Sequence, residues 1–232
     1  MPGFDGFSPT ALAFFRALRF HQDREWFREN KALYENEVKA PMLDLLEVLS
    51  ERFEKEGIPL RGDKKSMFRI NRDIRFSKNK QPYQTHTGAV MTPSGAKDDP
   101  GLVYIHISAP DLESMSDITG SFAAAGFYAP RTENLTVFRK AIQNDPAAFL
   151  ALEKQLKKVG LPLGRGGALT RLPRGFEDMK GSEIETALKL KGYVVEEPLD
   201  ADVVTSPKLV DRLVRLTKRA RPLLDWGWKA VG

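Results

Sequence analysis

The sequence predicts an α+β fold: a mainly antiparallel sheet with an N-terminal helical region and a C-terminal helix. Apolar residues recur every three or four positions near both ends of the chain, whereas they alternate with polar residues between positions 67 and 108. A turn-rich stretch at 93–101 separates two alternating runs, as in a hairpin with a long loop. No Pro- or Ser-rich linker divides the chain. We therefore expect a single α+β domain over residues 1–232, with residues 1–57 as a candidate helical subdomain.

Capping residues mark the first helices. Ser8-Pro9 is typical of a helix start, and that helix should end near Phe20. Asp23 can cap a second helix, and Pro41 predicts a break before a third that ends at Gly57. We expect their apolar and aromatic positions to be core: Leu12, Phe15 and Leu18; Trp26, Phe27 and Tyr34; Met42, Leu45, Leu46, Leu49 and Phe53.

Alternation predicts strands over 67–76, 87–91 and 102–108, and more loosely over the glycine-containing stretch 118–128. In the third of these, Tyr104, His106 and Ser108 should share the face opposite Val103, Ile105 and Ile107. Arg72 falls on the apolar side of the first, where an unpaired guanidinium is costly. Either that strand bends near Asn71 or Arg72 has an anionic partner.

The sequence predicts that the second half of the chain is again mainly helical. Helices are expected over 135–142 and, after Asp145-Pro146, up to Gly160. Ser182 and Glu185 resemble a capping box that opens a short helix, and residues 193–195 resemble a strand. The final helix follows Ser206-Pro207, and we expect it to bury Leu209, Val210, Leu213, Val214 and Leu216.

Composition excludes several classes of function. The chain has 232 residues and no cysteine, so disulfides, thiolate metal sites and cysteine nucleophiles are ruled out. The first residues lack a basic segment followed by an apolar run, and no apolar stretch is long enough to cross a bilayer. We therefore expect a cytoplasmic protein with no membrane partner. A net charge of +5 is compatible with a polyanionic partner without requiring one.

Residues 68–86 combine cations, hydroxyl groups and a histidine, with Asp73 as the one acidic residue. Arginines can bind phosphate or carboxylate bidentately, and lysines act as mobile point charges. The segment therefore predicts a site for a phosphate-bearing or other anionic ligand, either a small molecule such as a nucleotide or a nucleic acid. The candidate ligand-binding residues are Arg72, Arg75, Ser77, Lys78, Lys80, Tyr83, Thr85 and His86.

Two other interpretations of this segment are open. A hydrolase or transferase could use His86 and Asp73 for proton transfer, with Tyr83 beside them and the arginines stabilising negative charge. Alternatively, Arg72 could pair with Asp73 or Glu25 in a structural salt-bridge network that needs no ligand. Enzymatic and non-enzymatic roles both fit, and no cofactor is indicated. His86 and His106 could meet across paired strands, but three histidines without matched acidic spacing predict no metal site.

The same segment supports a resemblance to a known family. Arg72-Asp73-Ile74-Arg75-Phe76-Ser77-Lys78-Asn79-Lys80-Gln81-Pro82-Tyr83-Gln84-Thr85-His86 resembles the hallmark of a widespread family of uncharacterised bacterial and fungal proteins, a conserved domain of unknown function. Supporting matches are Asp23-Arg24-Glu25-Trp26-Phe27, Gly126-Phe127-Tyr128-Ala129-Pro130 and Leu172-Pro173-Arg174-Gly175-Phe176. Gln84 departs from the pattern, since the family usually has lysine there. The resemblance implies a shared fold and a shared set of residues, without an activity to transfer.

Overall fold

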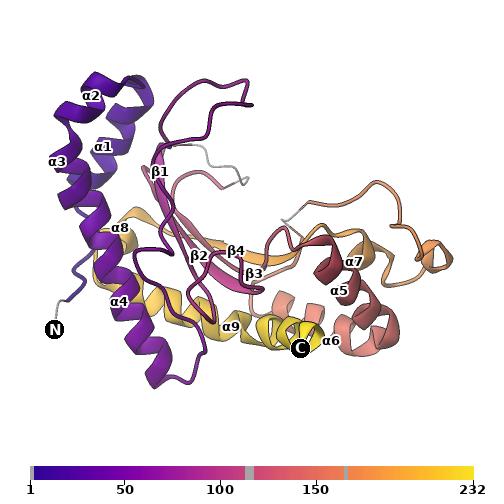
Figure 1. Cartoon of the computed structure of the whole chain (residues 1–232). Coiled ribbons are helices and arrows are strands. Elements are labelled where there is room, and N and C mark those ends of the chain that lie inside the picture. The colour runs from indigo at the N-terminus through magenta and orange to yellow at the C-terminus, as the bar shows by residue number, and fades with distance from the viewer. Residues whose placement is uncertain (1–2, 113–117, 165–166) are drawn as a thin grey trace. The chain divides into compact units, whose positions relative to one another are not determined.

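The computed structural model describes residues 3–112, 118–164 and 167–232. Its four-stranded antiparallel sheet has the strand order β1-β2-β3-β4 and is accompanied by helices before and after it (Figure 1). The strands are β1 (His86–Met91), β2 (Leu102–Ser108), β3 (Phe122–Phe127) and β4 (Tyr193–Pro198). The predicted α+β class is thereby confirmed. None of the described helices combines the length and the apolar character needed to span a bilayer.

The chain groups into two compact units. The first comprises Met1–Asp99, Tyr104–Ala123 and Pro198–Arg215, and the second comprises Pro100–Val103, Ala124–Glu197 and Leu216–Gly232. Strands β2, β3 and β4 and helix α9 (Lys208–Val231) each contribute residues to both units. The units are thus interleaved along the sequence, and one domain over 1–232 stays a prediction.

The first two helices begin where their caps predict. Ser8 accepts a hydrogen bond from the Ala11 amide at the start of α1 (Pro9–Phe20), and Asp23 accepts one from Trp26 at the start of α2 (Arg24–Glu29). Each cap satisfies an amide that has no partner inside the helix. Helix α1 ends at Phe20 as expected, and its buried positions are Ala11, Leu12, Phe14, Phe15 and Leu18.

The predicted break at Pro41 is wrong. A short α3 (Lys31–Leu33) leads into a π-helical segment, η1 (Tyr34–Lys39), and then directly into α4 (Ala40–Lys55). The Ala40 amide donates to the Glu35 carbonyl, five residues back. This wider turn accommodates a proline that has no N–H to donate. The buried face is continuous through the change of helix type: Tyr34, Val38, Met42, Leu45, Leu46, Leu49 and Phe53.

The predicted strand over 67–76 is also wrong. Residues 61–71 run antiparallel to residues 83–92, which contain β1, through isolated bridges that pair Arg61 with Thr92, Met67 with Ala89 and Asn71 with Tyr83. After Asn71 the chain leaves this ladder as a loop of residues 72–82, the basic loop, which extends beyond the start of β1 in Figure 1. Phe76, which the alternation assigns to the apolar side, is 95% exposed. The alternating pattern therefore does not mark a buried strand face here.

The β1–β2 hairpin with its long loop is confirmed. On one face of β2, Val103, Ile105 and Ile107 are fully buried, as the alternation predicts. On the other face Tyr104 is half-buried, whereas His106 and Ser108 are buried. Both faces of the strand are therefore covered at its C-terminal end.

The second unit contains α5 (Thr132–Asn144), α6 (Pro146–Lys158), the 3-10 turn η2 (Glu177–Met179) and α7 (Glu185–Lys189). Its core includes a ring cluster of Phe138, Phe149, Tyr193 and Trp226, with neighbouring ring centroids 5.0–5.9 Å apart. The predicted capping box at α7 is wrong. The Ser182 hydroxyl donates to the Met179 carbonyl, and Glu185 accepts from the Gly181 amide. The remaining short helix, α8 (Ala201–Val204), belongs to the first unit.

Candidate functional site

The base of the basic loop is closed by hydrogen bonds. The Arg72 amide donates to the Pro82 carbonyl at 2.8 Å, and the Gln84 amide donates to Ile70 at 2.7 Å. The Arg72 guanidinium donates through Nη1 to the Gln81 carbonyl at 3.2 Å. Within the described residues it forms no ion pair with Asp73 or Glu25. The bend near Asn71, rather than an anionic partner, explains how Arg72 avoids the core.

Asp73 is engaged by Arg75 at the surface. Arg75 Nε lies 3.0 Å from one carboxylate oxygen and Nη2 lies 2.7 Å from the other. These hydrogen bonds lower the pKa of Asp73 and raise the pKa of Arg75. The pair is exposed, so it organises the loop locally and adds little to stability. It also occupies the one carboxylate that the motif provides.

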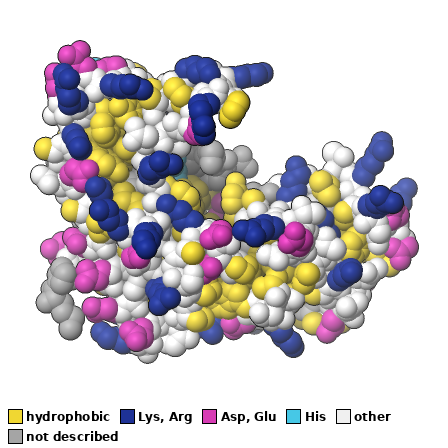
Figure 2. All heavy atoms as spheres, in the orientation of Figure 1, with side chains coloured by type: hydrophobic (Ala, Val, Ile, Leu, Met, Phe, Trp, Pro, Cys, Tyr) yellow, Lys and Arg dark blue, Asp and Glu magenta, His cyan; other side chains and the backbone are white. Residues whose placement is uncertain are grey.

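The tip of the loop presents cations around an exposed ring. Lys78 is exposed and makes no hydrogen bond or ion pair with any described residue, and Lys80 donates to the Ile74 carbonyl at 3.0 Å. The Arg75 guanidinium lies 5.9 Å from the centroid of the exposed Phe76 ring, and Ser77 is half-buried beside it. Figure 2 shows Lys and Arg side chains with a hydrophobic one where Figure 1 places this loop. The result is a convex, basic tip.

Tyr83 lies in an aromatic core. It is 5% exposed, and its ring stacks on Phe27 with a centroid distance of 4.4 Å. Phe27 in turn contacts Phe14 and Tyr34, and burial raises the pKa of Tyr34 to about 12. Of the early aromatic stripe expected to be core, Tyr34 is buried, whereas Trp26 and Phe27 are half-buried. Tyr83 extends this core, whereas the loop cations lie in solvent.

His86 and His106 meet across neighbouring strands. Their rings stack with centroids 4.1 Å apart, and the Tyr104 hydroxyl lies 3.1 Å from His106 Nδ1. Burial lowers the pKa of His86 to about 4 and, with a smaller contribution from His86, lowers that of His106 to about 2. Both imidazoles are therefore neutral near pH 7.

The predicted proton-transfer pair is not assembled. No hydrogen bond joins His86 to Asp73 in the part of the chain that the structure describes, and Asp73 is held by Arg75 instead. Thr85 is half-buried just before β1. Among the described residues, no three His, Asp or Glu side chains gather to hold a metal ion.

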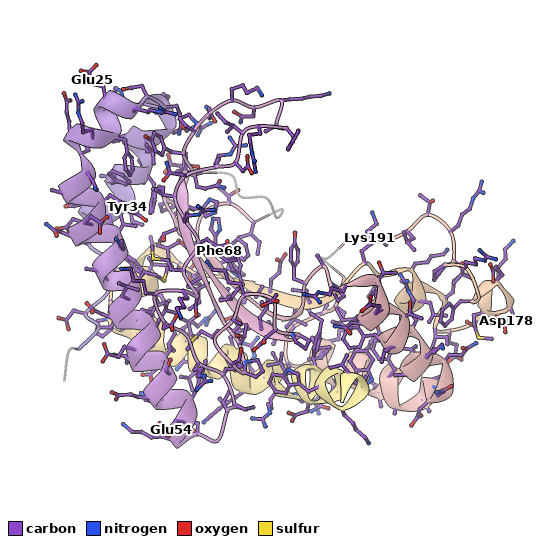
Figure 3. The ribbon with its side chains drawn as sticks, in the orientation of Figure 1. Glu25, Tyr34, Glu54, Phe68, Asp178 and Lys191 are labelled. Carbon is purple, nitrogen blue, oxygen red and sulfur yellow. The ribbon has the colours of Figure 1, made fainter. Side chains whose placement is uncertain are left out.

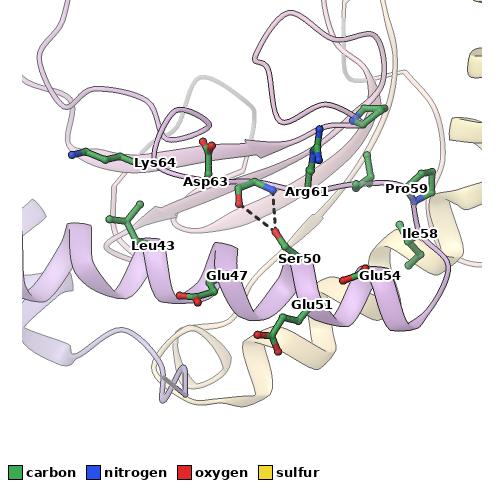
Figure 4. Close-up of a pocket in the computed structure, with 13 residues that line it drawn as sticks. Leu43, Glu47, Ser50, Glu51, Glu54, Ile58, Pro59, Arg61, Asp63 and Lys64 are labelled. Atoms are coloured by element: carbon green, nitrogen blue, oxygen red, sulfur yellow. Dashed lines mark hydrogen bonds between the residues drawn. The ribbon is translucent and has the colours of Figure 1, made fainter. Parts of the chain in front are cut away.

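A shallow groove of about 800 Å³ lies elsewhere in the first unit, between α4 and residues 58–64 (Figure 4). Ser50 joins its two walls, since the hydroxyl accepts from the Gly62 amide at 3.0 Å. Its charges are mixed, with Glu47, Glu51, Glu54 and Asp63 opposed by Arg61 and Lys64. None of the ligand-binding residues predicted from the sequence lines this groove.

Tertiary structure adds one cation to the candidate site. Lys97, in the β1–β2 loop, donates to the Met67 carbonyl at 2.7 Å and lies 4.9 Å from the Phe68 ring centroid. Phe68 is 42% exposed beside the sheet (Figure 3). Sequence reasoning missed Lys97 because it lies 30 residues from Met67 in a stretch that resembles an ordinary polar turn.

Comparison with known proteins identifies a matching family. The family described as "Conserved hypothetical protein (DUF2461)" matches residues 10–226. Neither the curated proteins nor the solved structures contain a match. The match covers both compact units and the whole basic loop. With nearly its entire length matched, the chain belongs to the DUF2461 family of conserved hypothetical proteins.

Proposed function

We propose that this protein binds the phosphate groups of a nucleic acid through the basic loop. The observation that carries the proposal is the exposed tip, where Lys78 and Lys80 project beside an exposed Phe76 and the one carboxylate, Asp73, is taken up by Arg75. Phosphate contacts supply most of the sequence-independent affinity for nucleic acids.

The shape of the loop favours a polymer over an enclosed small molecule. Small ligands are usually held in concave sites that bury most of their surface. The basic loop instead projects beyond the start of β1 (Figure 1), and its Arg75, Lys78 and Lys80 are exposed. A repeating polyanion can contact such a surface at several points without being enclosed.

The hallmark residues divide into two roles in this proposal. Arg72 closes the base, and the Asp73–Arg75 pair shapes the turn. Lys78 and Lys80 then carry the mobile charges that meet phosphate, while Arg75 offers its remaining donors. Ser77, Thr85 and His86 lie half-buried near the loop and reach solvent in part.

The test measures binding of a short fluorescent single-stranded oligonucleotide at salt concentrations from about 50 to 200 mM. Affinity should fall linearly on logarithmic axes as counterions are released. Replacing Lys78 and Lys80 together by Ala should reduce that slope by about 1.4, because each phosphate contact on a single strand contributes about 0.7.

The matched control replaces Lys154 and Lys158 by Ala. Both are exposed on α6, so net charge changes equally while the basic loop is untouched. The control should bind as wild type does. Equal losses in both variants, or an affinity independent of salt, would contradict the proposal.

A further inference from the structure

One sheet face of the first unit carries rings from three strands and from the segment bridged to β1. This ring face consists of Phe68, His86, Tyr104, His106 and Phe122. His86 stacks on His106 at 4.1 Å, and His106 stacks on Phe122 at 4.7 Å. Tyr104 contacts Phe68 and Phe122 edge to face, with centroids 6.1 and 5.7 Å apart. The five rings form one connected surface.

The inner rings support the outer ones. His106 and Phe122 are buried, whereas Phe68 is 42% exposed and His86 and Tyr104 are half-buried. Gly88 lets Tyr104 lie across β1, since a Cβ at that position would come 2.7 Å from the tyrosine hydroxyl. Rings held in place in this way lose little conformational freedom when a flat ligand stacks on them.

Two cations lie close to Phe68: Lys97 in space, and Arg69 as the next residue along the chain. Lys97 Nζ lies over the Phe68 ring, and Arg69 is exposed with no hydrogen bond or ion pair to any described residue. Burial and, to a smaller extent, the charge of Arg69 lower the pKa of Lys97. The nearby acids are partly engaged, since Asp73 binds Arg75 and Asp99 accepts from the Ser94 amide. Positive charge beside Phe68 is therefore available to an anion.

The ring face also adjoins the basic loop along the chain. Tyr83, which pairs with Asn71 where the loop closes, precedes His86 by three residues, which is about 10 Å of extended chain. The Phe68 amide donates to the Gly88 carbonyl at 2.8 Å, so Phe68 and the loop base belong to the same bridged ladder. A strand bound at the loop can continue onto the rings.

We infer that the ring face stacks the unpaired bases of a single-stranded nucleic acid whose phosphates contact Arg69, Lys97 and the basic loop. This inference rests on the proposed function and names its ligand class. Stacking requires bases that are free of the duplex, whereas cations alone attract any polyanion. An exposed Phe68 beside the half-buried His86 and Tyr104, with Lys97 over the Phe68 ring, is the arrangement that favours such ligands.

The experiment compares two strands of equal length and charge: oligothymidine, and an abasic deoxyribose-phosphate strand. Wild type should bind oligothymidine at least about fivefold more tightly, the low end of what one stacked base contributes. The F68L variant keeps an apolar side chain and should lose this preference. F20L, at the 80% exposed Phe20 of α1, should keep it.

A second readout is independent of affinity. Oligothymidine carrying 5-iodouracil should photocrosslink to the peptides that contain Phe68 or Tyr104, and thermal unfolding of F68L should match wild type closely enough to show that it is folded. Equal binding of the two strands by wild type, or an unchanged preference in F68L, would overturn the inference. Polyglutamate or duplex DNA binding as tightly as oligothymidine would overturn it as well.

The loop variant separates this inference from the proposed function. If K78A/K80A weakens both strands equally and F68L removes only the preference for bases, both proposals hold. If F68L acts and K78A/K80A does not, the basic-loop proposal fails while the ring face stands. If neither strand binds wild type, both proposals fail.

Discussion

Arg72 in the first unit and Arg139 in the second place the same guanidinium in opposite environments. Arg72 is half-exposed and donates to one loop carbonyl, that of Gln81. Arg139 is 6% exposed and donates to the carbonyls of Leu188 and Leu190 at 2.8 and 3.1 Å. Burial lowers the pKa of Arg139. Sequence pattern singled out Arg72 as the anomalous cation, yet the buried one is Arg139.

The difference shows how each unit uses positive charge. In the second unit the guanidinium joins α5 to the end of α7, where carbonyls have no helical partner. In the basic loop the cations are exposed or half-exposed, and the hydrogen bonds that they make stay within the loop. A buried cation of this kind contributes to stability, whereas exposed ones contribute mainly to binding.

The largest expected effect comes from Arg139→Met. The change removes both hydrogen bonds and leaves two buried carbonyls without donors, so the free energy of unfolding should fall by roughly 2–4 kcal/mol. Urea denaturation measures this. Lys140→Met, at the exposed neighbouring position, is the control and should stay close to wild type. If Arg139→Met lowered the free energy of unfolding only slightly, Arg139 would not contribute more to stability than the half-exposed Arg72.

Acid should destabilise the protein through the stacked histidines. Their pKa values of about 4 and 2 lie below the ordinary 6.5, so the unfolded chain binds protons first as pH falls. Stability from their neutral forms is complete above about pH 6.5 and decreases below it, by about 2 kcal/mol for His86 at pH 5. His86→Gln should flatten this part of the stability curve in denaturation experiments, whereas His21→Gln should not. Identical curves for both variants would argue against buried, neutral imidazoles.

Phe76 provides a smaller effect that appears in binding alone. Because the ring is 95% exposed, Phe76→Ala should leave the unfolding free energy unchanged. Its affinity for a single-stranded oligonucleotide should fall by about 1 kcal/mol, or fivefold, if the ring contacts a base. Phe20→Ala, which removes another exposed ring, should change neither quantity. A loss of stability without a loss of affinity would mean that the loop packs elsewhere.

A small stability effect is expected for Arg72→Met. Only one hydrogen bond to a part-exposed carbonyl is lost, so the cost should stay below about 1 kcal/mol. A buried ion pair at Arg72 would instead cost about 3–5 kcal/mol. Thermal or urea unfolding therefore distinguishes the open loop from a structural salt-bridge network directly.

Much of the fold could be predicted from the sequence because the signals are local. Ser8, Asp23 and Asp145 each cap a helix through an amide three residues away. The alternation of Val103, Ile105 and Ile107 likewise reflects a buried strand face. Such patterns are satisfied within a few residues, whatever packs against them.

Only the tertiary structure decided the rest. The stretch 67–76 alternates much as β2 does, but its bridges to the segment that contains β1 end at Asn71, and beyond it no described strand pairs with residues 72–76. Tyr83 and Lys78 belong to the same motif, but Tyr83 is buried where its ring stacks on Phe27, whereas Lys78 is exposed. The approach of Lys97 to Phe68 and of His86 to His106 also depends on chain pairing over long distances. The amino-acid sequence by itself therefore determined the capped helices, the β1–β2 hairpin and the basic character of the motif. Packing between distant segments decided which of its residues reach a ligand, because burial depends on the partner that each side chain meets.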